Sequence, residues 1–217
     1  MGRNYGQYCG LARALDVIGD RWNLLIVRQL LVSPARYRQL VEGLPGIATN
    51  LLANRLRDLE TAGVVERRLT DDDGHVVYAL TQWGTELRAP IEGLIRWSTP
   101  MMVRGPAGDR FRSEWLLVAL PALIAGRVPV QWPATIGISV GGAVIQVHAM
   151  HSGIAVRPHD GRELDAVISA DAHVVLGLAV GMLTLDQVRG MVVIDGDEAA
   201  VRAVLGGVES AAGVSHM

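Results

Sequence analysis

Lysine is missing from this 217-residue chain, and all 20 of its basic residues are arginine. The single cysteine excludes an intramolecular disulfide framework and a zinc site built from cysteine ligands. Aromatic residues make up only 5% of the chain, so its core is expected to be mainly aliphatic. The longest apolar run, residues 115–125, is too short to cross a bilayer and contains a proline, and the first residues lack a signal-peptide pattern. These absences predict a soluble, cytoplasmic protein without a membrane partner.

The formal net charge of −2 argues against a protein that coats nucleic acid without selectivity. The charge is unevenly placed, because residues 1–104 carry a net +2 and residues 105–217 a net −4. The length suits two small domains. We therefore expect two domains, 1–104 and 105–217, with the basic excess in the first.

Residues 47–64, with the sequence IATNLLANRLRDLETAGV, predict an amphipathic helix. Its apolar face is formed by leucines at spacings of four and three, and its outer face is polar or small. The apolar positions are Leu52, Leu56 and Leu59, and the outer ones are Thr49, Asn50, Ala53, Asn54 and Arg57. Amides on such a face can bond adenine edges, and a guanidinium suits guanine or phosphate. Thr49 is expected to be the N-cap and Gly63 a left-handed C-cap. An ordinary surface helix has a similar pattern, so the flanking elements decide between the two interpretations.

Three helices are predicted before this one, over residues 9–18, 21–32 and 36–44. The first should carry Leu11, Leu15 and Ile18 on one face, and Asp20 should cap the second. Two strands, 64–69 and 75–80, follow around an Asp-Asp-Asp-Gly turn. Helix, turn, helix and hairpin in this order are typical of a winged helix, in which one helix enters the DNA groove and the hairpin reaches the backbone or minor groove.

The predicted hairpin carries its own DNA-binding candidates. Arg67 and Arg68 point to opposite sides of the first strand, so one of them should face DNA. The three aspartates at the tip, residues 71–73, either repel phosphate or serve only the turn. Contact is therefore expected through Arg67, Arg68 or His75.

Residues Cys9 to Leu87 resemble the HxlR family of winged-helix transcription regulators, which is related to the MarR group. The matching segments are CGLARALDVIGDRWNLLIVRQLL, YRQLVEGLPGIATNLLANRLRDLETAGVVERR and VVYALTQWGTEL. The resemblance implies a homodimer, built from the first and last helices of this domain, on a palindromic operator. It places the outer-face residues at or near DNA, and Arg55 with them, although Arg55 could instead pair with Asp58 or Glu60. The complete predicted interface comprises Arg36, Thr49, Asn50, Asn54, Arg55, Arg57, Arg67, Arg68 and His75.

Cys9 lies at the start of the first predicted helix, where the helix dipole favours a thiolate. Arg13, one turn further on, would add to this effect. Some relatives in the resembling family use a cysteine at this place to sense oxidants or electrophiles. The alternative is a small packing residue in the dimer interface.

A closing helix is predicted from Thr81 to Arg104, capped by Thr81 and kinked or split at Pro90. It is a natural dimerisation helix. Residues 99–109, with two prolines and two glycines, are expected to form a linker.

The second half predicts an α+β domain. A helix over 111–126 precedes four strands at 134–140, 143–150, 154–157 and 164–169. Helices at 172–181, 184–188 and 198–205 and a strand at 191–194 complete it. The segment DAVISADAHVVLGLAVGMLTLDQVRGMVVIDGDEAAVRAVL resembles the sterol-carrier-protein type-2-like domain.

That resemblance implies an apolar tunnel between sheet and helices. Its candidate lining residues are Trp115, Leu120, Trp132, Met150, Val175, Leu178, Met182 and Met191, although plain core packing is the alternative for each. No metal, cofactor or enzymatic site is expected, because no nucleophile elbow or phosphate loop is visible. The sequence predicts a one-component regulator, most simply a repressor, controlled by an apolar small molecule. A sensor acting through Cys9 and a lipid carrier without DNA function are the alternatives.

Overall fold

The computed structural model describes residues 4–70, 74–127, 135–150 and 153–205 of the chain. The chain divides into two compact units, Met1–Ile91 and Glu92–Met217. This division falls inside helix α6 (Arg88–Ser98), ahead of the predicted domain boundary after residue 104.

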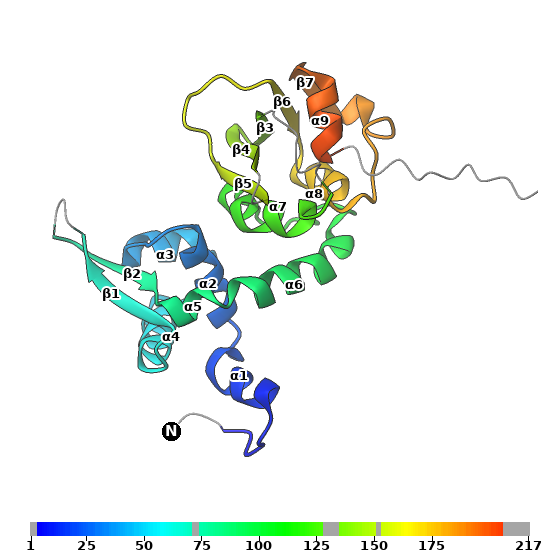
Figure 1. Ribbon diagram of the computed structural model, residues 1–217. Helices are drawn as coiled ribbons and strands as arrows, with labels where there is room; N and C mark the ends of the chain where they lie inside the picture. Colours follow the sequence, from blue (N-terminus) through cyan, green and yellow to red (C-terminus); the bar gives the residue numbers. More distant parts are fainter. Residues whose placement is uncertain (1–3, 71–73, 128–134, 151–152, 206–217) are drawn as a thin grey trace, which may run out of the picture. The chain divides into compact units, whose positions relative to one another are not determined.

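The first unit contains four helices, a two-stranded hairpin and the start of a closing helical segment (Figure 1). The elements are α1 (Gly10–Ile18), α2 (Asn23–Val32), α3 (Tyr37–Gly43), α4 (Thr49–Thr61), β1 (Val65–Leu69), β2 (Val76–Leu80) and α5 (Gln82–Thr85). Their order confirms the predicted winged helix.

The hairpin is antiparallel, with Val65 opposite Leu80 and Leu69 opposite Val76. Ala35, just before α3, extends this small sheet by exchanging backbone hydrogen bonds of 3.0 and 2.9 Å with Tyr78. The predicted aspartate turn at 71–73 lies outside the described residues. The hairpin is therefore anchored to the helical part through its second strand.

Both predicted N-caps ahead of α2 and α4 are wrong. Ala48 precedes α4 in an extended conformation, so Thr49 is the first helical residue. Trp22 precedes α2, and the carboxylate of Asp20 pairs with Arg55 of α4 instead of capping a helix. Asp20 thus forms an ion pair with a residue far along the chain and no side-chain capping hydrogen bond to α2.

The end of α4 follows the prediction. Gly63 has φ +74°, its N–H bonds the Glu60 carbonyl at 3.0 Å, and the N–H of Val64 bonds the Leu59 carbonyl at 2.9 Å. This pair of bonds is a Schellman motif, in which glycine takes the left-handed position. It turns the chain directly from α4 into β1.

Helix α1 forms as predicted, and its two leucines are exposed. Ala12 is its one residue buried in the chain, whereas Leu11 is 68% and Leu15 39% exposed. The leucine stripe of α1 thus lies on the surface of the described chain.

The closing segment is split as expected. The hydroxyl of Thr81 accepts the Gly84 N–H at 3.0 Å and caps α5, and a new helix, α6, starts at Arg88. Pro90 lies in the first turn of α6, where a missing N–H costs no helical bond. Thr99 begins a 3₁₀ helix, η1 (Thr99–Met102), and is only 1% exposed, so the predicted linker cannot begin there.

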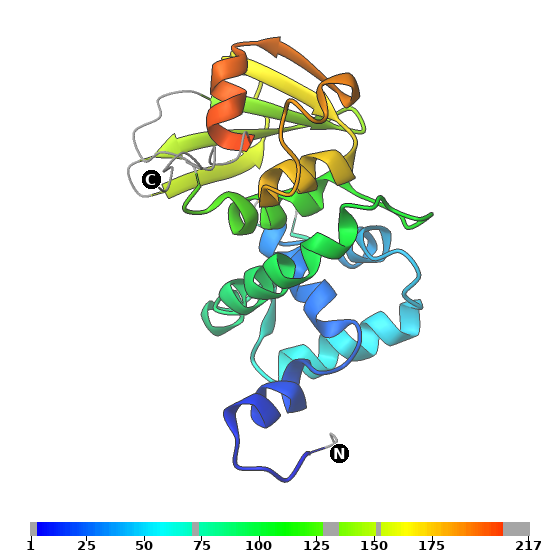
Figure 2. The same cartoon turned by 90° about the vertical axis from the view of Figure 1, so that its right-hand side faces the viewer.

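The second unit is a five-stranded sheet with helices on one face (Figures 1 and 2). Its elements are η2 (Ser113–Trp115), α7 (Leu116–Ile124), β3 (Thr135–Val140), β4 (Ala143–Met150), β5 (Gly153–Pro158), β6 (Ala166–Ala170), α8 (Ala172–Val180), η3 (Arg189–Met191), β7 (Val192–Gly196) and α9 (Glu198–Leu205). The strand order is β5-β4-β3-β6-β7, and only the β3–β6 pair is parallel.

One face of this sheet and the helices α7, α8 and α9 form a single aliphatic core. Ile136, Ile138 and Ile168 are completely buried in it from the sheet side. The α+β class is confirmed, and the predicted helix at 184–188 is wrong, since the chain there forms a turn followed by η3. The sheet and helix segments otherwise match the predictions to within a few residues.

Candidate nucleic-acid interface

Helix α4 has one buried and one exposed face. Leu52, Leu56 and Leu59 are at most 1% exposed, because they pack into the core of the first unit. On the other side Thr49, Asn50, Asn54 and Arg57 are exposed, and Ala53 between them is half-buried. The structure therefore brings the predicted outer-face residues together on one continuous surface.

The polar groups on this outer face support one another. The guanidinium of Arg57 donates to the Asn54 amide oxygen and, at 3.4 Å, to the carbonyl of Ala53. The Arg57 carbonyl accepts the Thr61 hydroxyl at 2.9 Å. Arg57 and Asn54 are thus held side by side along the helix with their donors at the surface. A planar guanidinium beside an amide is a combination that can bond base edges.

The start of α4 is fixed by a residue that the sequence did not single out. The Tyr37 hydroxyl, on α3, donates to the Thr49 carbonyl at 2.6 Å. No motif in the sequence indicates this bond. It ties the two helices of the helix-turn-helix together at the end where base contacts are usually made.

Arg55 behaves as its alternative interpretation foresaw. Its guanidinium pairs with Asp20 and, at 3.2 Å, with Asp58, and its side chain is only 23% exposed. Asp58 was one of the two partners considered, and Asp20 takes the place of Glu60. With two carboxylates around it, Arg55 connects the start of α2 to α4 and is a poor candidate for DNA contact.

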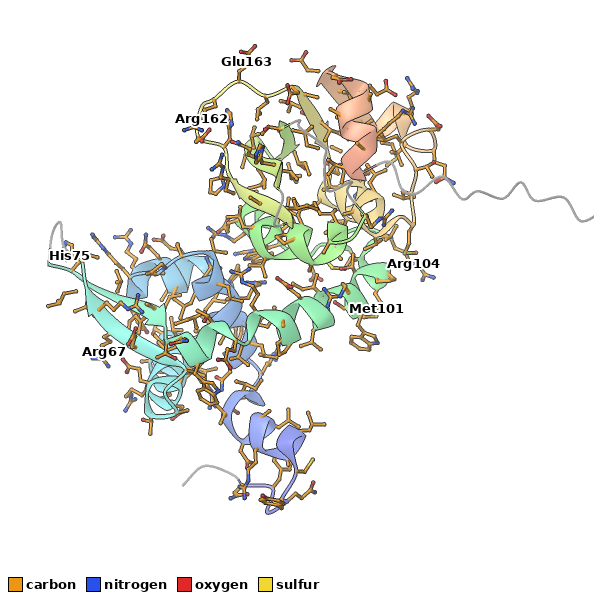
Figure 3. All side chains as sticks on the ribbon, viewed as in Figure 1. Arg67, His75, Met101, Arg104, Arg162 and Glu163 are labelled. Atoms are coloured by element: carbon orange, nitrogen blue, oxygen red, sulfur yellow. The ribbon has the colours of Figure 1, made fainter. Side chains whose placement is uncertain are left out.

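Both hairpin arginines are also paired within the unit, and Figure 3 labels Arg67 on β1. Arg67 forms two bonds with the Glu60 carboxylate, at 2.7 and 2.9 Å, and its guanidinium lies 5.6 Å from the ring centre of Tyr78. The hydrogen bond to Glu60 raises the pKa of Arg67 above its usual range. Arg67 therefore fastens the hairpin to the last turn of α4.

Arg68 faces a neighbour on its own strand. Its Nε donates to Glu66 at 2.7 Å, and a second nitrogen approaches the Leu80 carbonyl at 3.4 Å. Its side chain is 54% exposed, so it reaches the surface with its charge already compensated.

The remaining predicted contacts lie at the surface. Arg36 precedes α3, where its N–H donates to the Gln39 side chain at 2.7 Å. His75, labelled in Figure 3, begins the return of the hairpin and bonds Thr70 through its backbone. Both residues are exposed.

Cys9 is exposed and occupies the N-cap position of α1. Hydrogen bonds from the backbone N–H groups of Ala12 and Leu11 lower the pKa of its thiol. Arg13 does not supply this effect as predicted, because its guanidinium turns to Asn4 at 3.3 Å and Asp16 at 3.4 Å.

The predicted tunnel residues of the second unit have different environments. Leu120, Val175 and Leu178 are completely buried in the core, Trp115 is half-buried, and Met182 and Met191 are 52% and 54% exposed. Trp132 and the side chain of Met150 lie outside the described part of the structure. The buried members pack with the apolar core, as their alternative interpretation foresaw.

The described residues contain no group of three or more histidine, cysteine, aspartate or glutamate side chains that could hold a metal ion. None of their helices has the length and apolar character needed to cross a membrane.

Comparison with known proteins places the similarity in the first half of the chain. Residues 17–105 match the model of a protein family described as "HxlR-like helix-turn-helix". The HTH-type transcriptional regulator YodB of Bacillus subtilis is 37% identical over 86 residues, which cover 39% of this chain and 77% of YodB. YvaP, an uncharacterized HTH-type regulator of the same organism, is 38% identical over 89 residues, which cover 40% of this chain and 82% of YvaP.

Solved structures are similar over the same share of the chain. The crystal structure of quinone-bound YodB from B. subtilis is 34% identical and covers 42% of this chain and 96% of its own, with a TM-score of 0.37. That of PA1607, a transcription factor by its description, is 34% identical and covers 49% of this chain and 74% of its own, with a TM-score of 0.44.

Proposed function

The chain belongs to the HxlR-like helix-turn-helix family of transcription regulators, and we propose that it binds a palindromic operator as a homodimer with α4 in the major groove. The observation that carries this proposal is the outer face of α4, where Thr49, Asn50, Asn54 and Arg57 are exposed opposite a buried leucine face. Such a face can meet base edges, and the fastened hairpin sets its orientation. The relatives that match are transcription regulators and not enzymes.

Surface apolar residues on two helices support the homodimer. Leu11 and Leu15 are exposed on α1. Leu94, Trp97 and Met101 follow one another at spacings of three and four along α6 and η1, and they are 48%, 75% and 65% exposed. Figure 3 labels Met101. Apolar stripes of this kind mark interaction surfaces, and a second copy would cover them.

The test is the affinity of the Arg57→Ala variant for DNA from its own promoter, measured by fluorescence anisotropy. We expect a loss of about 1–3 kcal/mol, or roughly 5- to 150-fold, if Arg57 contacts a base. Arg162→Ala is the matched control, because it removes one arginine from the surface of the second unit and its side chain is 78% exposed. Unchanged specific affinity of Arg57→Ala would refute the assignment.

We further propose that an apolar small molecule in the second unit controls operator binding and relieves repression. The support is the sterol-carrier-like pattern and a sheet whose one face and helices enclose a purely aliphatic interior. The ligand would act by binding one dimer geometry better than the other. Adding apolar compounds to the anisotropy assay tests this proposal. A compound that binds both dimer geometries equally well would leave the DNA-binding curve unchanged, and such a result for every compound would contradict the proposal. Absence of any selective DNA binding would instead favour a lipid carrier.

The specific observation that favours a second candidate is the exposed Cys9 with its lowered pKa. A thiolate there would react with oxidants or electrophiles, and quinones are natural probes because YodB has a quinone-bound structure. Loss of the response in Cys9→Ser, with operator affinity retained, would support this sensor over apolar-ligand control.

A further inference from the structure

The first unit has a cleft with a volume of about 750 Å³, and none of the residues proposed above for DNA binding or dimerisation lines it. One wall comes from α1, and the other comes from α5 and the first turn of α6. This volume lies in the range of sites that hold small molecules, about 300–1,000 Å³. The cleft is separate from the outer face of α4, since none of the proposed base-contacting residues lines it.

The interior of the cleft is apolar and has one aromatic surface. Val17 and Ile18 of α1 form one side, and Leu87 and Pro90 form the other. Trp83, on α5, contributes an indole side chain and is 52% exposed. An exposed tryptophan beside aliphatic walls offers a flat face on which an aromatic ring can stack.

The cleft is lined by two acidic side chains and one basic side chain, and only one of the two acids is paired with the base. Asp16 accepts bonds from Arg13 at 3.4 Å and from the Tyr5 N–H at 3.0 Å, and Arg13 also donates to Asn4 at 3.3 Å. Glu86, the second acid of the lining, lies on the opposite wall and is exposed. No hydrogen bond or ion pair joins its carboxylate to another described residue. The cleft therefore holds one carboxylate whose charge is not compensated by a hydrogen bond or ion pair from the described part of the chain.

We infer that this cleft binds a planar aromatic cation, such as a protonated aromatic amine or an aromatic quaternary ammonium compound. The ring would lie between Trp83 and the aliphatic walls, and the positive charge would lie toward Glu86. Both groups attract a cation, Trp83 through its ring face and Glu86 through its charge. An anionic aromatic compound would meet the same carboxylate and be repelled. The inference goes beyond the proposed function, because it assigns a site in the DNA-binding unit and requires no DNA.

The test uses three naphthalene probes of matched shape, namely 1-naphthylmethylammonium, 1-naphthylmethanol and 1-naphthoate, titrated into the full chain by calorimetry. The cation is expected to bind at least about tenfold more tightly than the alcohol, and the carboxylate most weakly. Glu86→Gln should bring the cation to the affinity of the alcohol. Glu42→Gln, which removes the same charge from α3 outside the cleft, should leave the preference intact.

The aromatic part of the site has its own variants. Trp83→Ala should weaken binding of both the cation and the alcohol at least about tenfold, whereas Trp83→Phe should retain much of it. A thermal melt of each variant confirms that the fold is kept. Equal affinities for the three probes, or an unchanged preference in Glu86→Gln, would overturn the inference. So would binding that weakens as protein concentration rises, because a second copy would then occupy the cleft.

Operator affinity measured on the same variants separates this inference from the proposed function. Glu86→Gln should bind DNA like the unmodified chain, because Glu86 lies outside the predicted DNA interface. A chain that binds the cation but no operator would refute the regulator proposal and leave the cleft assignment standing. A chain that binds the operator but none of the three probes would refute the cleft assignment and leave the regulator proposal standing.

Discussion

Gly84 is the position where one added methyl group should disturb the first unit most. A Cβ atom there would lie 2.1 Å from the Val64 carbonyl oxygen and 3.0 Å from its carbon, more than an ångström inside ordinary van der Waals contact with the oxygen. The obstacle is backbone at the start of β1, so no side-chain rotation can relieve it. In Gly84→Ala, α5 must therefore move away from the strand.

That movement has a cost that can be estimated from the bonds at the junction. Thr81 donates its N–H to Val64 at 3.1 Å and its hydroxyl to the Gly63 carbonyl at 2.7 Å. Overpacking costs about 1–3 kcal/mol, and each weakened hydrogen bond adds about 1 kcal/mol. We expect Gly84→Ala to lower the free energy of unfolding by about 2–4 kcal/mol. For a unit of this size, Tm should fall by roughly 10–25 °C.

Differential scanning calorimetry and urea unfolding measure this effect. The matched control is Gly10→Ala in α1, since a Cβ there meets nothing within 4 Å and Gly10 has no positive φ. Because alanine is the better helix former, the control should be neutral or slightly stabilising. A loss below about 0.5 kcal/mol in Gly84→Ala would refute the tight docking of α5 on the strand.

Two further predictions concern a reactive group and a helix end. Backbone hydrogen bonds lower the pKa of the Cys9 thiol. Its alkylation by iodoacetamide should therefore have a lower pH midpoint in the folded chain than in the urea-unfolded chain, and equal midpoints would contradict this. Arg127→Ala should lower the free energy of unfolding of the second unit by about 1 kcal/mol, because Arg127 donates to the Ala179 carbonyl at 3.0 Å near the end of α8. Its urea midpoint should fall with an unchanged m-value, and an unchanged midpoint would contradict the assignment.

The periodic segments could be predicted from the sequence, because their periods are set by local geometry. The leucine spacing places α4 and its buried face correctly, and Glu198–Leu205 forms α9 as expected. The segment 184–188 shows the limit of this method. Leu185 and Val188 are buried, as a helical spacing of three requires, and Thr184 and Gln187 exchange side-chain bonds of 2.9 and 3.4 Å of the kind that begins a helix. The chain nevertheless forms only a turn there. An apolar spacing of three over five residues fits both structures.

The pairings of the candidate site could not be predicted in the same way. Whether Arg55 and Arg67 face DNA depends on which carboxylates the fold brings to them, and Asp20 lies 35 residues before Arg55. Glu60 and Arg67 meet because the chain reverses at Gly63 and returns β1 past the last turn of α4. Sequence periodicity identified the exposed positions. Only the tertiary arrangement shows which of the arginines there are paired with a carboxylate.

These pairings limit how operator affinity can be controlled. Tyr37 holds the start of α4, and the Glu60–Arg67 pair holds its end. Tyr78 of β2 lies beside Arg67 of β1 and joins the hairpin to the backbone of Ala35. Over the described residues, helix and hairpin are thus held together at both ends. A signal that changes affinity would therefore either move them together relative to the second copy of the proposed dimer or break one of these contacts. Arg67→Ala tests whether the Glu60–Arg67 pair holds the hairpin or whether Arg67 contacts DNA. A loss of operator selectivity without a smaller salt dependence would identify an intramolecular role, whereas a salt slope reduced by about one would identify a phosphate contact.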